Sequence, residues 1–446
     1  TSKRSLYMTK LSTDLMKTKR SLFNYPSRVT AGHHKPRSKF VADMLFGILA
    51  SGSTHLTEIS RALREKTKPI NTVDRLSRWL KQPILRSERW CHLQHMVQLL
   101  PERPIILVDD TDIVKPRGRC FESMARIRDG SCSSDKKAVI GNGYLCTEMV
   151  AVTKETAHAV SLYSHIHSPA EAGYKSTNVE TYKGLNDVMM VLPKPATFVF
   201  DRGHDQDELF GYFSDEQTNA GKHTFIIRLK STRLLTKDAS GIGGWKCVSD
   251  WANRYKGTYR FAVQRWDSEK SKVRDSVVYV TAIRVRTRAS AVMQSLLLVY
   301  RDNQAPMFLL TNADVQSKEA CRRIVLAYHM RWRIEEYFRF KKQCYGFEDF
   351  RVRSLARIRH LNHLLTLALG WLGMMIEKSK SPSHAAYALL RQAKAIRETV
   401  TFYYYRLFNG VYILFRQART GMRGFFQPRA RPDPQMTMEQ WQRMIA

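Results

Sequence analysis

The stretch of residues 324–350 constrains the fold of this chain more than any other part. It contains no proline, and its only glycine is Gly346, so it predicts one long helix. Four polar residues occur along it at offsets of zero, three, seven and fourteen, namely Tyr328, Arg331, Glu335 and Lys342. Because an α-helix turns by about 100° per residue, these side chains fall within an arc of roughly 60° and form one stripe.

This stripe has a chemical and a structural interpretation. The Glu335 carboxylate can bind a divalent metal ion, while the two cations and the tyrosine hydroxyl can hold a phosphate-bearing strand. A solvated helix with ordinary charge pairs between successive turns has the same residue types. Apolar neighbours such as Ile334 and Phe338, together with aspartates upstream, favour the chemical interpretation.

The charge of the chain points to a polyanionic partner. It has 73 Lys and Arg against 40 Asp and Glu, a formal net charge of +33. Nucleic acid is the default partner for such a chain, and a membrane surface is the alternative. The longest largely apolar run, residues 364–376, is too short to span a bilayer, and we find no signal pattern. The seven cysteines are scattered and never spaced C-x-x-C, which indicates reduced thiols in a cytoplasm.

A buried strand is predicted from Pro104, where the sequence reads PIILVDDTDI. It ends in Asp109, Asp110 and Asp112, and three carboxylates this close repel one another unless a cation is bound. Alternation along a strand places Asp109 on the face of Leu107 and Asp110 on the opposite face, so only one of them can join a shared site. An Asx turn or a helix cap is the structural alternative.

A second buried strand is predicted within PATFVFDRGHD, where it ends at Asp201. Arg202 follows as a phosphate-binding or structural partner. A strand-terminal acid with a matching acid elsewhere in the chain is a candidate for a shared functional site.

Together these motifs resemble those of the bacterial insertion-sequence-four (IS4) family of transposases. The spacing Y-x2-R-x3-E-x6-K of Tyr328, Arg331, Glu335 and Lys342 resembles the family's catalytic helix, and Asp109 and Asp201 match its two strand-end aspartates. The resemblance implies an α/β fold with an RNase H-like core. It also implies a DDE triad of Asp109, Asp201 and Glu335 that binds two Mg²⁺ ions per active site, with Mn²⁺ as a substitute.

The resemblance also implies DNA contacts and an insertion. Tyr328, Arg331, Lys342 and Arg228 would hold the DNA near the cut. Five predicted strands between Asp201 and Glu335 would form the β-rich insertion that splits the core, namely HTFIIRLK, YRFAVQRW, DSVVYVTAIRVR, SLLLVYRD and MFLLTN. Some members use a tryptophan in the last of these strands to stack on a flipped base. The matching position here is Met307, beside Phe308, so base capture is either absent or done by another residue.

The expected domain organisation has five parts. They are a basic arm and helical DNA-binding domain at 1–100, a first core part at 101–215, the β-rich insertion at 216–312, a second core part at 313–378, and a helical region at 379–446. In the first part, Pro26, Gly32 and Pro36 interrupt any long helix, and residues 1–40 form a basic arm that is a solvated tail or lies on DNA phosphates. Three short helices are expected at 40–82, with Asn71 or Thr72 as the N-cap of the last. They either resemble a DNA-binding helix-turn-helix or simply pack against one another as a small bundle.

Other elements are predicted by periodicity and turn residues. Residues 115–137 form a basic loop, 138–166 two strands of a meander, and 176–192, 207–214, 354–378 and 384–395 helices. Residues 403–405 are apolar core rather than a stacking surface for bases, and the tail QPRARPDPQ is loose.

The resulting hypothesis is a cut-and-paste DNA transposase. It would bind the terminal inverted repeats of an insertion sequence, cleave the ends and join them to target DNA, as a homodimer on double-stranded DNA in the bacterial cytoplasm and nucleoid. One alternative is a transposase-derived DNA-binding protein without catalysis, which has no need of three converging carboxylates. Another is an RNase H-superfamily nuclease, which would cut without end specificity and without joining.

Overall fold

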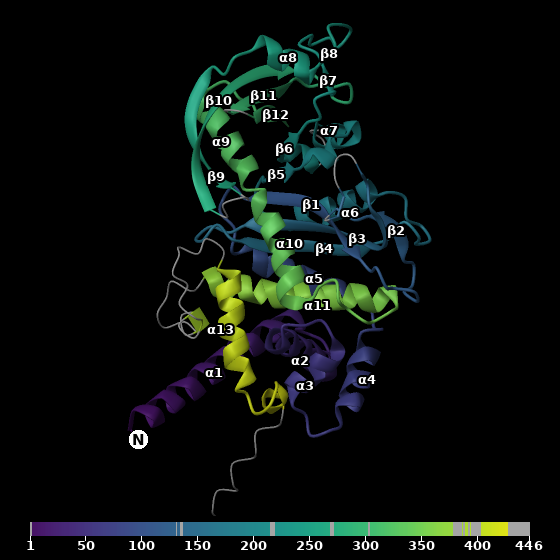
Figure 1. Cartoon of the computed structure of the whole chain (residues 1–446), viewed down its shortest axis with the longest axis vertical. Helices are drawn as coiled ribbons and strands as arrows, with labels where there is room; N and C mark the ends of the chain where they lie inside the picture. Colours follow the sequence, from purple (N-terminus) through teal and green to yellow (C-terminus); the bar gives the residue numbers. More distant parts are fainter. Residues whose placement is uncertain are drawn as a thin grey trace, which may run out of the picture.

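The computed structural model describes residues 2–130, 132–133, 137–214, 219–267, 272–301, 304–377, 386, 389–390, 393 and 403–426. Over these residues the chain is a mixed α/β protein built around one large sheet, which confirms the predicted α/β class (Figure 1). Apolar side chains from the two faces of this sheet belong to two separate core clusters, one containing Leu107 and Val199 and the other Val108 and Phe200.

The central sheet contains ten strands. Their order is β2-β3-β1-β5-β6-β12-β11-β10-β9, and β4 also pairs with β3. The strands are β1 (Ile105–Val114), β2 (Ala125–Arg128), β3 (Ile140–Val152), β4 (Ala159–His167), β5 (Thr197–Phe200), β6 (Thr224–Arg228), β9 (Tyr259–Asp267), β10 (Lys272–Val285), β11 (Gln294–Arg301) and β12 (Gln304–Thr311). A separate small hairpin consists of β7 (Leu234–Leu235) and β8 (Lys246–Cys247).

Helices cover this sheet and form a group at one end of the molecule (Figure 1). They are α1 (Ser2–Val29), α2 (Lys35–Ser51), α3 (Leu56–Leu63), α4 (Pro69–Trp79), α5 (Arg86–Val97), α6 (Thr177–Met189), α7 (Asp207–Ser214), α8 (Val248–Arg254), α9 (Lys318–His329), α10 (Trp332–Tyr345), α11 (Leu355–Glu377) and α13 (Tyr404–Arg416). Among the described helices, none is long and apolar enough to cross a membrane.

Three parallel strands place the acidic residues. β1 runs parallel to β5, and β5 runs parallel to β6. The register between β1 and β5 ends at the pair Val108 and Phe200, so Asp109 and Asp201 are the next residue on each strand. β1 does not stop at its acids as predicted. It continues to Val114 because β3 pairs with it in antiparallel register as far as that residue.

The strands predicted between Asp201 and Glu335 are present, and they extend the central sheet. β12 pairs with β6, and β11, β10 and β9 follow as antiparallel neighbours. The meander of β3 and β4 beside β1 is also confirmed. The predicted basic loop at 115–137 is interrupted by the short strand β2, which gains backbone hydrogen bonds by pairing with β3.

The prediction that Pro26 interrupts the helix is wrong, because α1 continues through it to Val29, whereas the chain does leave the helix around Gly32 before α2 starts at Lys35. A proline inside a helix costs about 3 kcal/mol. Leu22 and Val29 are fully or almost fully buried in the core, and each such side chain contributes about 1.5–3 kcal/mol on burial. Burial therefore outweighs the local cost. The predicted caps are wrong too, since Asn71 and Thr72 lie inside α4, which starts at Pro69.

The stretch 324–350 is two helices, not the single helix that was predicted. α9 ends at His329 and α10 begins at Trp332. Across the junction the backbone bonds span three residues: the amide of Arg331 donates to the carbonyl of Tyr328 (3.0 Å), and that of Ile334 to the carbonyl of Arg331 (3.1 Å). No residue here breaks a helix by itself, and the interruption coincides with the ion pair of Arg331 to β1. α10 ends at Gly346, whose φ of 57° is the left-handed conformation that glycine favours.

The helical group packs around α11, which is buried along most of its length. α2 packs against α11 and α13, and Thr54 donates a hydrogen bond to the carbonyl of Gly346 at the end of α10 (2.8 Å). Tyr404 is fully buried, as predicted for core, whereas Tyr403 and Tyr405 are half-buried. The predicted helix at 384–395 falls mostly outside the described residues, and the tail QPRARPDPQ falls wholly outside them.

Candidate active site

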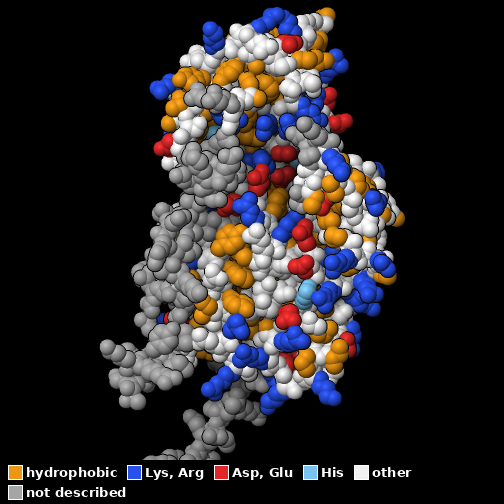
Figure 2. All heavy atoms as spheres, viewed as in Figure 1, with side chains coloured by type: hydrophobic (Ala, Val, Ile, Leu, Met, Phe, Trp, Pro, Cys, Tyr) orange, Lys and Arg blue, Asp and Glu red, His pale blue; other side chains and the backbone are white. Residues whose placement is uncertain are grey.

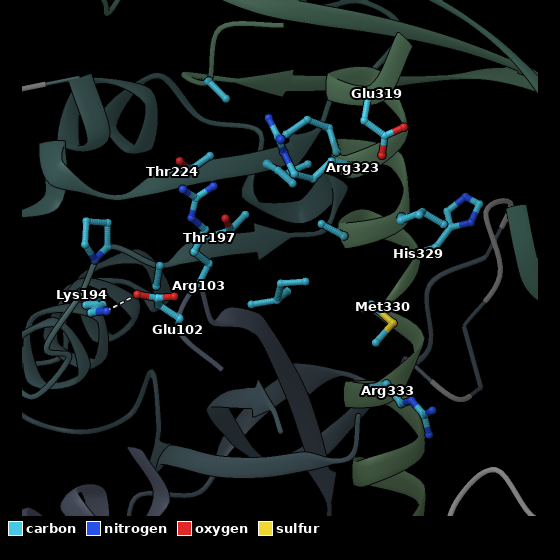
Figure 3. Close-up of a pocket in the computed structure, with 18 of the residues that line it drawn as sticks. Glu102, Arg103, Lys194, Thr197, Thr224, Glu319, Arg323, His329, Met330 and Arg333 are labelled. Carbon is cyan, nitrogen blue, oxygen red and sulfur yellow. Dashed lines mark hydrogen bonds and ion pairs between the residues drawn. The ribbon is translucent and has the colours of Figure 1, made fainter. Parts of the chain in front are cut away.

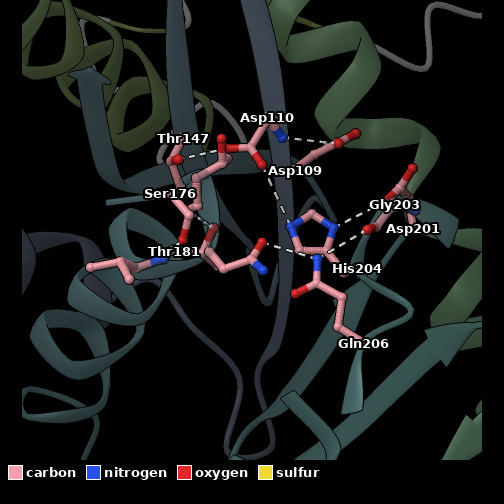
Figure 4. A network of polar contacts seen from close by, with 12 residues as sticks. Asp109, Asp110, Thr147, Ser176, Thr181, Asp201, Gly203, His204 and Gln206 are labelled. Carbon is pink, nitrogen blue, oxygen red and sulfur yellow. Dashed lines mark hydrogen bonds and ion pairs between the residues drawn. The ribbon is translucent and has the colours of Figure 1, made fainter. Parts of the chain in front are cut away.

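Asp109 and Asp201 project from neighbouring parallel strands into one site (Figure 4). Asp201 follows β5 directly, and its Oδ1 atom accepts hydrogen bonds from the amide of Gly203 (2.7 Å) and from Nδ1 of His204 (2.9 Å). The short DRGH turn thus folds back on its own aspartate. One carboxylate oxygen of Asp201 is fixed by this turn.

Arg331 connects Asp109 with Glu335. Its Nη1 atom lies 3.1 Å from Oδ2 of Asp109, and its Nη2 atom donates to Oε1 of Glu335 in the first turn of α10. Asp109 and Arg331 are mostly buried, whereas the Glu335 side chain is about half exposed. The guanidinium therefore balances two carboxylates that come from residues far apart in the sequence.

The two aspartates differ in proton affinity. Burial and the nearby Asp201 carboxylate together raise the pKa of Asp109 to about 7, against the opposing effect of Arg331. Burial also acts to raise the pKa of Asp201, but the hydrogen bond and charge of His204 outweigh it, so this pKa is lowered. Two carboxylates that share a site separate their pKa values in this way.

Asp110 lies on the other face of β1, as strand alternation predicted. Its Oδ1 atom accepts a hydrogen bond from the Thr147 hydroxyl on β3 (2.5 Å), and its Oδ2 atom lies 3.6 Å from Nε2 of His204. His204 therefore lies between Asp201 and Asp110 (Figure 4). Burial alone would lower the pKa of His204, but the hydrogen bond to Asp201 and the charge of Asp110 raise it.

Tyr328 and Arg228 complete the site on the side of α9 and β6. Arg228 is the last residue of β6, and its guanidinium hydrogen-bonds to the Tyr328 hydroxyl. Burial raises the pKa of Tyr328, while the charges of Arg331 and Arg228 act to lower it. A phenol and two guanidinium groups thus lie next to the carboxylates.

Lys342 is the one member of the predicted stripe that lies apart from this cluster. Its Nζ atom donates to the carbonyl of Asp112 (2.9 Å) and forms an ion pair with Glu348 (2.8 Å). It therefore joins α10 to the far end of β1. The contacts that the structure gives it are to the protein itself.

Sequence reasoning missed two groups. His204 was visible in the motif DRGHD, three residues after Asp201, but its role depends on Asp110 across the sheet. The second group is the fully buried ion pair of Lys341 with Glu148 (2.8 Å), which the Asn362 side chain also contacts. Its only sequence signal was a lysine on the apolar side of a helix.

The donor atoms in this site fit a hard divalent cation. Asp109, Asp201 and Glu335 offer carboxylate oxygens, which Mg²⁺ and Mn²⁺ prefer. Burial is the main cause of the raised pKa of Asp109, and the Asp201 carboxylate is the next, with Arg331 opposing both. Among the described residues, no group of three or more His, Cys, Asp or Glu side chains is placed to hold a metal ion, and Glu335 is paired with Arg331.

Met307 and Phe308 are both buried within β12, with 3% and 7% of their surfaces exposed. A base cannot stack on side chains that are covered in this way. Neither residue therefore replaces the stacking tryptophan in this conformation.

Comparison with known proteins gives one family. Residues 100–371 match the family described as "Transposase DDE domain", a range that includes every site residue named above. No curated protein matches the chain. Among solved structures, the chain is similar to one titled "Cryo-EM structure of piggyBac transposase synaptic complex with hairpin DNA", with 8% sequence identity and a TM-score of 0.39. This similarity covers 85% of this chain but 61% of that chain, which is less than two thirds of its length.

Proposed function

The chain belongs to the DDE transposase family, and from this premise we propose that it is a cut-and-paste transposase of an insertion sequence. It would bind the terminal inverted repeats of its element, cleave the DNA there and join the ends to target DNA. The observation that carries this proposal is the meeting of Asp109, Asp201, Arg331 and Glu335 in one site.

We further propose that the chain is a bacterial member of the IS4 family with an RNase H-like core, acting on the nucleoid. Such a core is supported by the strand order β4-β3-β1-β5-β6. Within this order, only β1, β5 and β6 run parallel to their neighbours. The five domains expected from the sequence remain part of this proposal, with the insertion strands attached to the edge of β6.

Asp109, Asp201 and Glu335 would hold two Mg²⁺ ions. When bound, such ions activate a water or a 3′-hydroxyl as the attacking group and stabilise the leaving oxygen of an in-line displacement. The carboxylates are held ready for this role by their neighbours. His204 orients Asp201, and Arg331 keeps Asp109 and Glu335 balanced in charge.

The other side chains would position the DNA strand. Tyr328 and Arg228 offer a hydroxyl and a guanidinium beside the carboxylates, a suitable pair for a phosphate oxygen. Arg331 would contact the same phosphate once a cation has taken over its balancing role. Lys342 would act mainly by holding α10 against β1, since its ammonium is bound to Asp112 and Glu348.

The direct test is an assay of strand cleavage on DNA that carries the element's own ends. We expect cleavage with Mg²⁺ or Mn²⁺ and binding without cleavage in Ca²⁺, which accepts looser geometry. Tight binding without cleavage in Mg²⁺ and Mn²⁺ would favour the non-catalytic alternative. Cleavage of arbitrary DNA without joining would favour the nuclease.

A second prediction separates the adjacent aspartates of β1. Asp109→Asn should reduce cleavage by on the order of 10³-fold or more, because Asp109 shares its site with Asp201 and Arg331. Asp110→Asn should reduce it only about tenfold, since the amide can still accept the bond from Thr147 and loses only the charge beside His204. Cleavage rates of the two purified variants decide the matter, and the reverse order would move the catalytic role to Asp110.

A third prediction concerns the assembly. A transposase that cuts before its two ends are paired would leave a broken chromosome, so we propose a homodimer on two DNA ends in which each chain cuts the end held by its partner. A chain with Glu335→Gln should then be complemented by a chain whose DNA-end contact is removed. Cleavage in the mixture should clearly exceed the sum of the two separate chains.

The structure makes this second variant specific. Lys68, Arg78 and Lys81 are exposed on and beside α4, whereas α2 is buried against α11 and cannot be altered without unfolding. Replacing these three residues by alanine should reduce end binding and keep the fold. If no mixture restores cleavage while one chain alone cuts single ends efficiently, the proposal that each chain cuts the end held by its partner is wrong.

A further inference from the structure

A cavity of about 1100 Å³ lies beneath α9, away from the catalytic carboxylates (Figure 3). Its floor is formed by the first residues of β1, β5 and β6, and its wall by α9 and the start of α10. The residues that matter here are Arg103, Thr197, Thr224, Arg323, Met330 and Trp332. The carboxylates, by contrast, follow the last paired residues of β1 and β5.

The cavity and the candidate active site are linked by β1. Ile105 lines the cavity, and Asp109 lies four residues further along the same face of the strand. At about 3.3 Å per residue the two are roughly 13 Å apart.

The charge inside the cavity is positive where the floor meets α9. Arg103 and Arg323 both point into the cavity (Figure 3). Among the described residues, neither forms an ion pair within 4.0 Å. Each of the two acids at the rim pairs with another cation, Glu102 with Lys194, which also lines the cavity, and Glu319 with Arg322 (3.7 Å). Two guanidinium groups are therefore available for an anion.

Hydroxyl groups lie beside these cations. Thr197 and Thr224 are direct partners in the parallel pairing of β5 with β6, so their side chains lie next to each other on the floor. Both are half-buried. Two guanidinium groups with two hydroxyls offer several donors to one phosphate, and the apolar wall of Met330 and Trp332 suits the sugar of a nucleotide.

We propose that this cavity is a second, non-catalytic site for a phosphodiester of a DNA strand. The inference rests on the proposed function, because it takes the strand to be one whose reacting phosphate lies at Asp109. The strand is either the DNA that flanks the element or the target DNA, and both have the same chemistry. A second copy of this chain is a poor occupant, since its 73 basic residues far exceed its 40 acidic ones.

The test uses the full chain with Arg103→Gln and Arg323→Gln combined. Lys318→Gln is the control, because Lys318 lies on α9, is exposed and does not line the cavity, and no acid of the cavity rim pairs with it among the described residues. Binding of a short single-stranded oligonucleotide, followed by fluorescence anisotropy at fixed salt, should weaken about tenfold in the double variant and hardly change in the control. Equal affinity of the double variant and the control overturns the proposal.

Two further measurements identify the source of the strand. If the cavity holds flanking DNA, the double variant should cut uncleaved ends about tenfold more slowly and join pre-cleaved ends normally. If it holds target DNA, cutting should be normal and joining slowed. Normal rates in both steps overturn the proposal.

Failure of this inference is distinguishable from failure of the proposed function. A wild-type chain that cuts no DNA in Mg²⁺ or Mn²⁺ contradicts the proposed function, yet oligonucleotide binding still reports on the cavity. A wild-type chain that cuts and joins, with a double variant that behaves like Lys318→Gln in every measurement, contradicts the cavity alone.

Discussion

Glu335→Gln is expected to abolish strand cleavage, by on the order of 10³-fold or more, while binding of DNA ends stays nearly unchanged. The side chain is about half exposed in the first turn of α10, so the amide fits without strain. What is lost is one negative charge beside Asp109 and Arg331, and with it one oxygen donor for a divalent ion. Cleavage and gel-shift assays on the same DNA end measure the two effects.

Glu336→Gln is the matched control. It lies on the same turn of α10, and its carboxylate pairs with Arg339 (3.6 Å) rather than with the candidate site. We expect it to cut DNA within about threefold of wild type, because the neutral amide fits the buried position of Glu336 and its partner Arg339 is half exposed to solvent. Near wild-type cleavage by Glu335→Gln would remove Glu335 from the triad, and equal losses in both variants would point to damage of the helix.

Lys341→Met is expected to destabilise the fold by about 3–5 kcal/mol, the effect of removing one partner from a buried ion pair. Lys341 and Glu148 are both almost completely inaccessible, and the pair joins α10 to the central sheet. The substitution leaves the Glu148 carboxylate buried, with only Ser161 and Ser164 as hydrogen-bond donors among the contacts described for it. The free energy of unfolding in urea, followed by circular dichroism, measures the loss.

The neighbouring Lys342→Met provides the control for this prediction. Lys342 is partly exposed, and its loss should cost about 1 kcal/mol, since its partners can bind water instead. Combining Lys341→Met with Glu148→Leu should recover most of the stability, because no buried charge then remains. A loss below about 1 kcal/mol for Lys341→Met alone would mean that the pair is hydrated and contributes little.

Local residue patterns were sufficient to predict most of the strands and the positions of the acidic residues on them. Alternation and apolar runs identified β1, β5 and the strands β9–β12, because burial on a pleated sheet imposes a period of two or a continuous apolar run. The same alternation separated Asp109 from Asp110, since successive side chains of a strand point to opposite faces. The spacing of Tyr328, Arg331 and Glu335 predicted their common location for the equivalent reason in a helix.

Long-range contacts decided the rest. No residue type marks the interruption between α9 and α10, which coincides with the ion pair of Arg331 to Asp109 on a distant strand. Pro26 signals a broken helix locally, but burial of Leu22 and Val29 outweighs that signal.

The same holds for the charged groups around the site. His204 lies between Asp201 and Asp110 only because β1 and β5 are neighbours in the sheet, and Lys341 is stable in the core only because Glu148 faces it from β3. The sequence determines which side chains a face presents, because that depends on periodicity. The tertiary structure determines which charges meet, because the energy of an ion pair depends on distance and burial and not on separation along the chain.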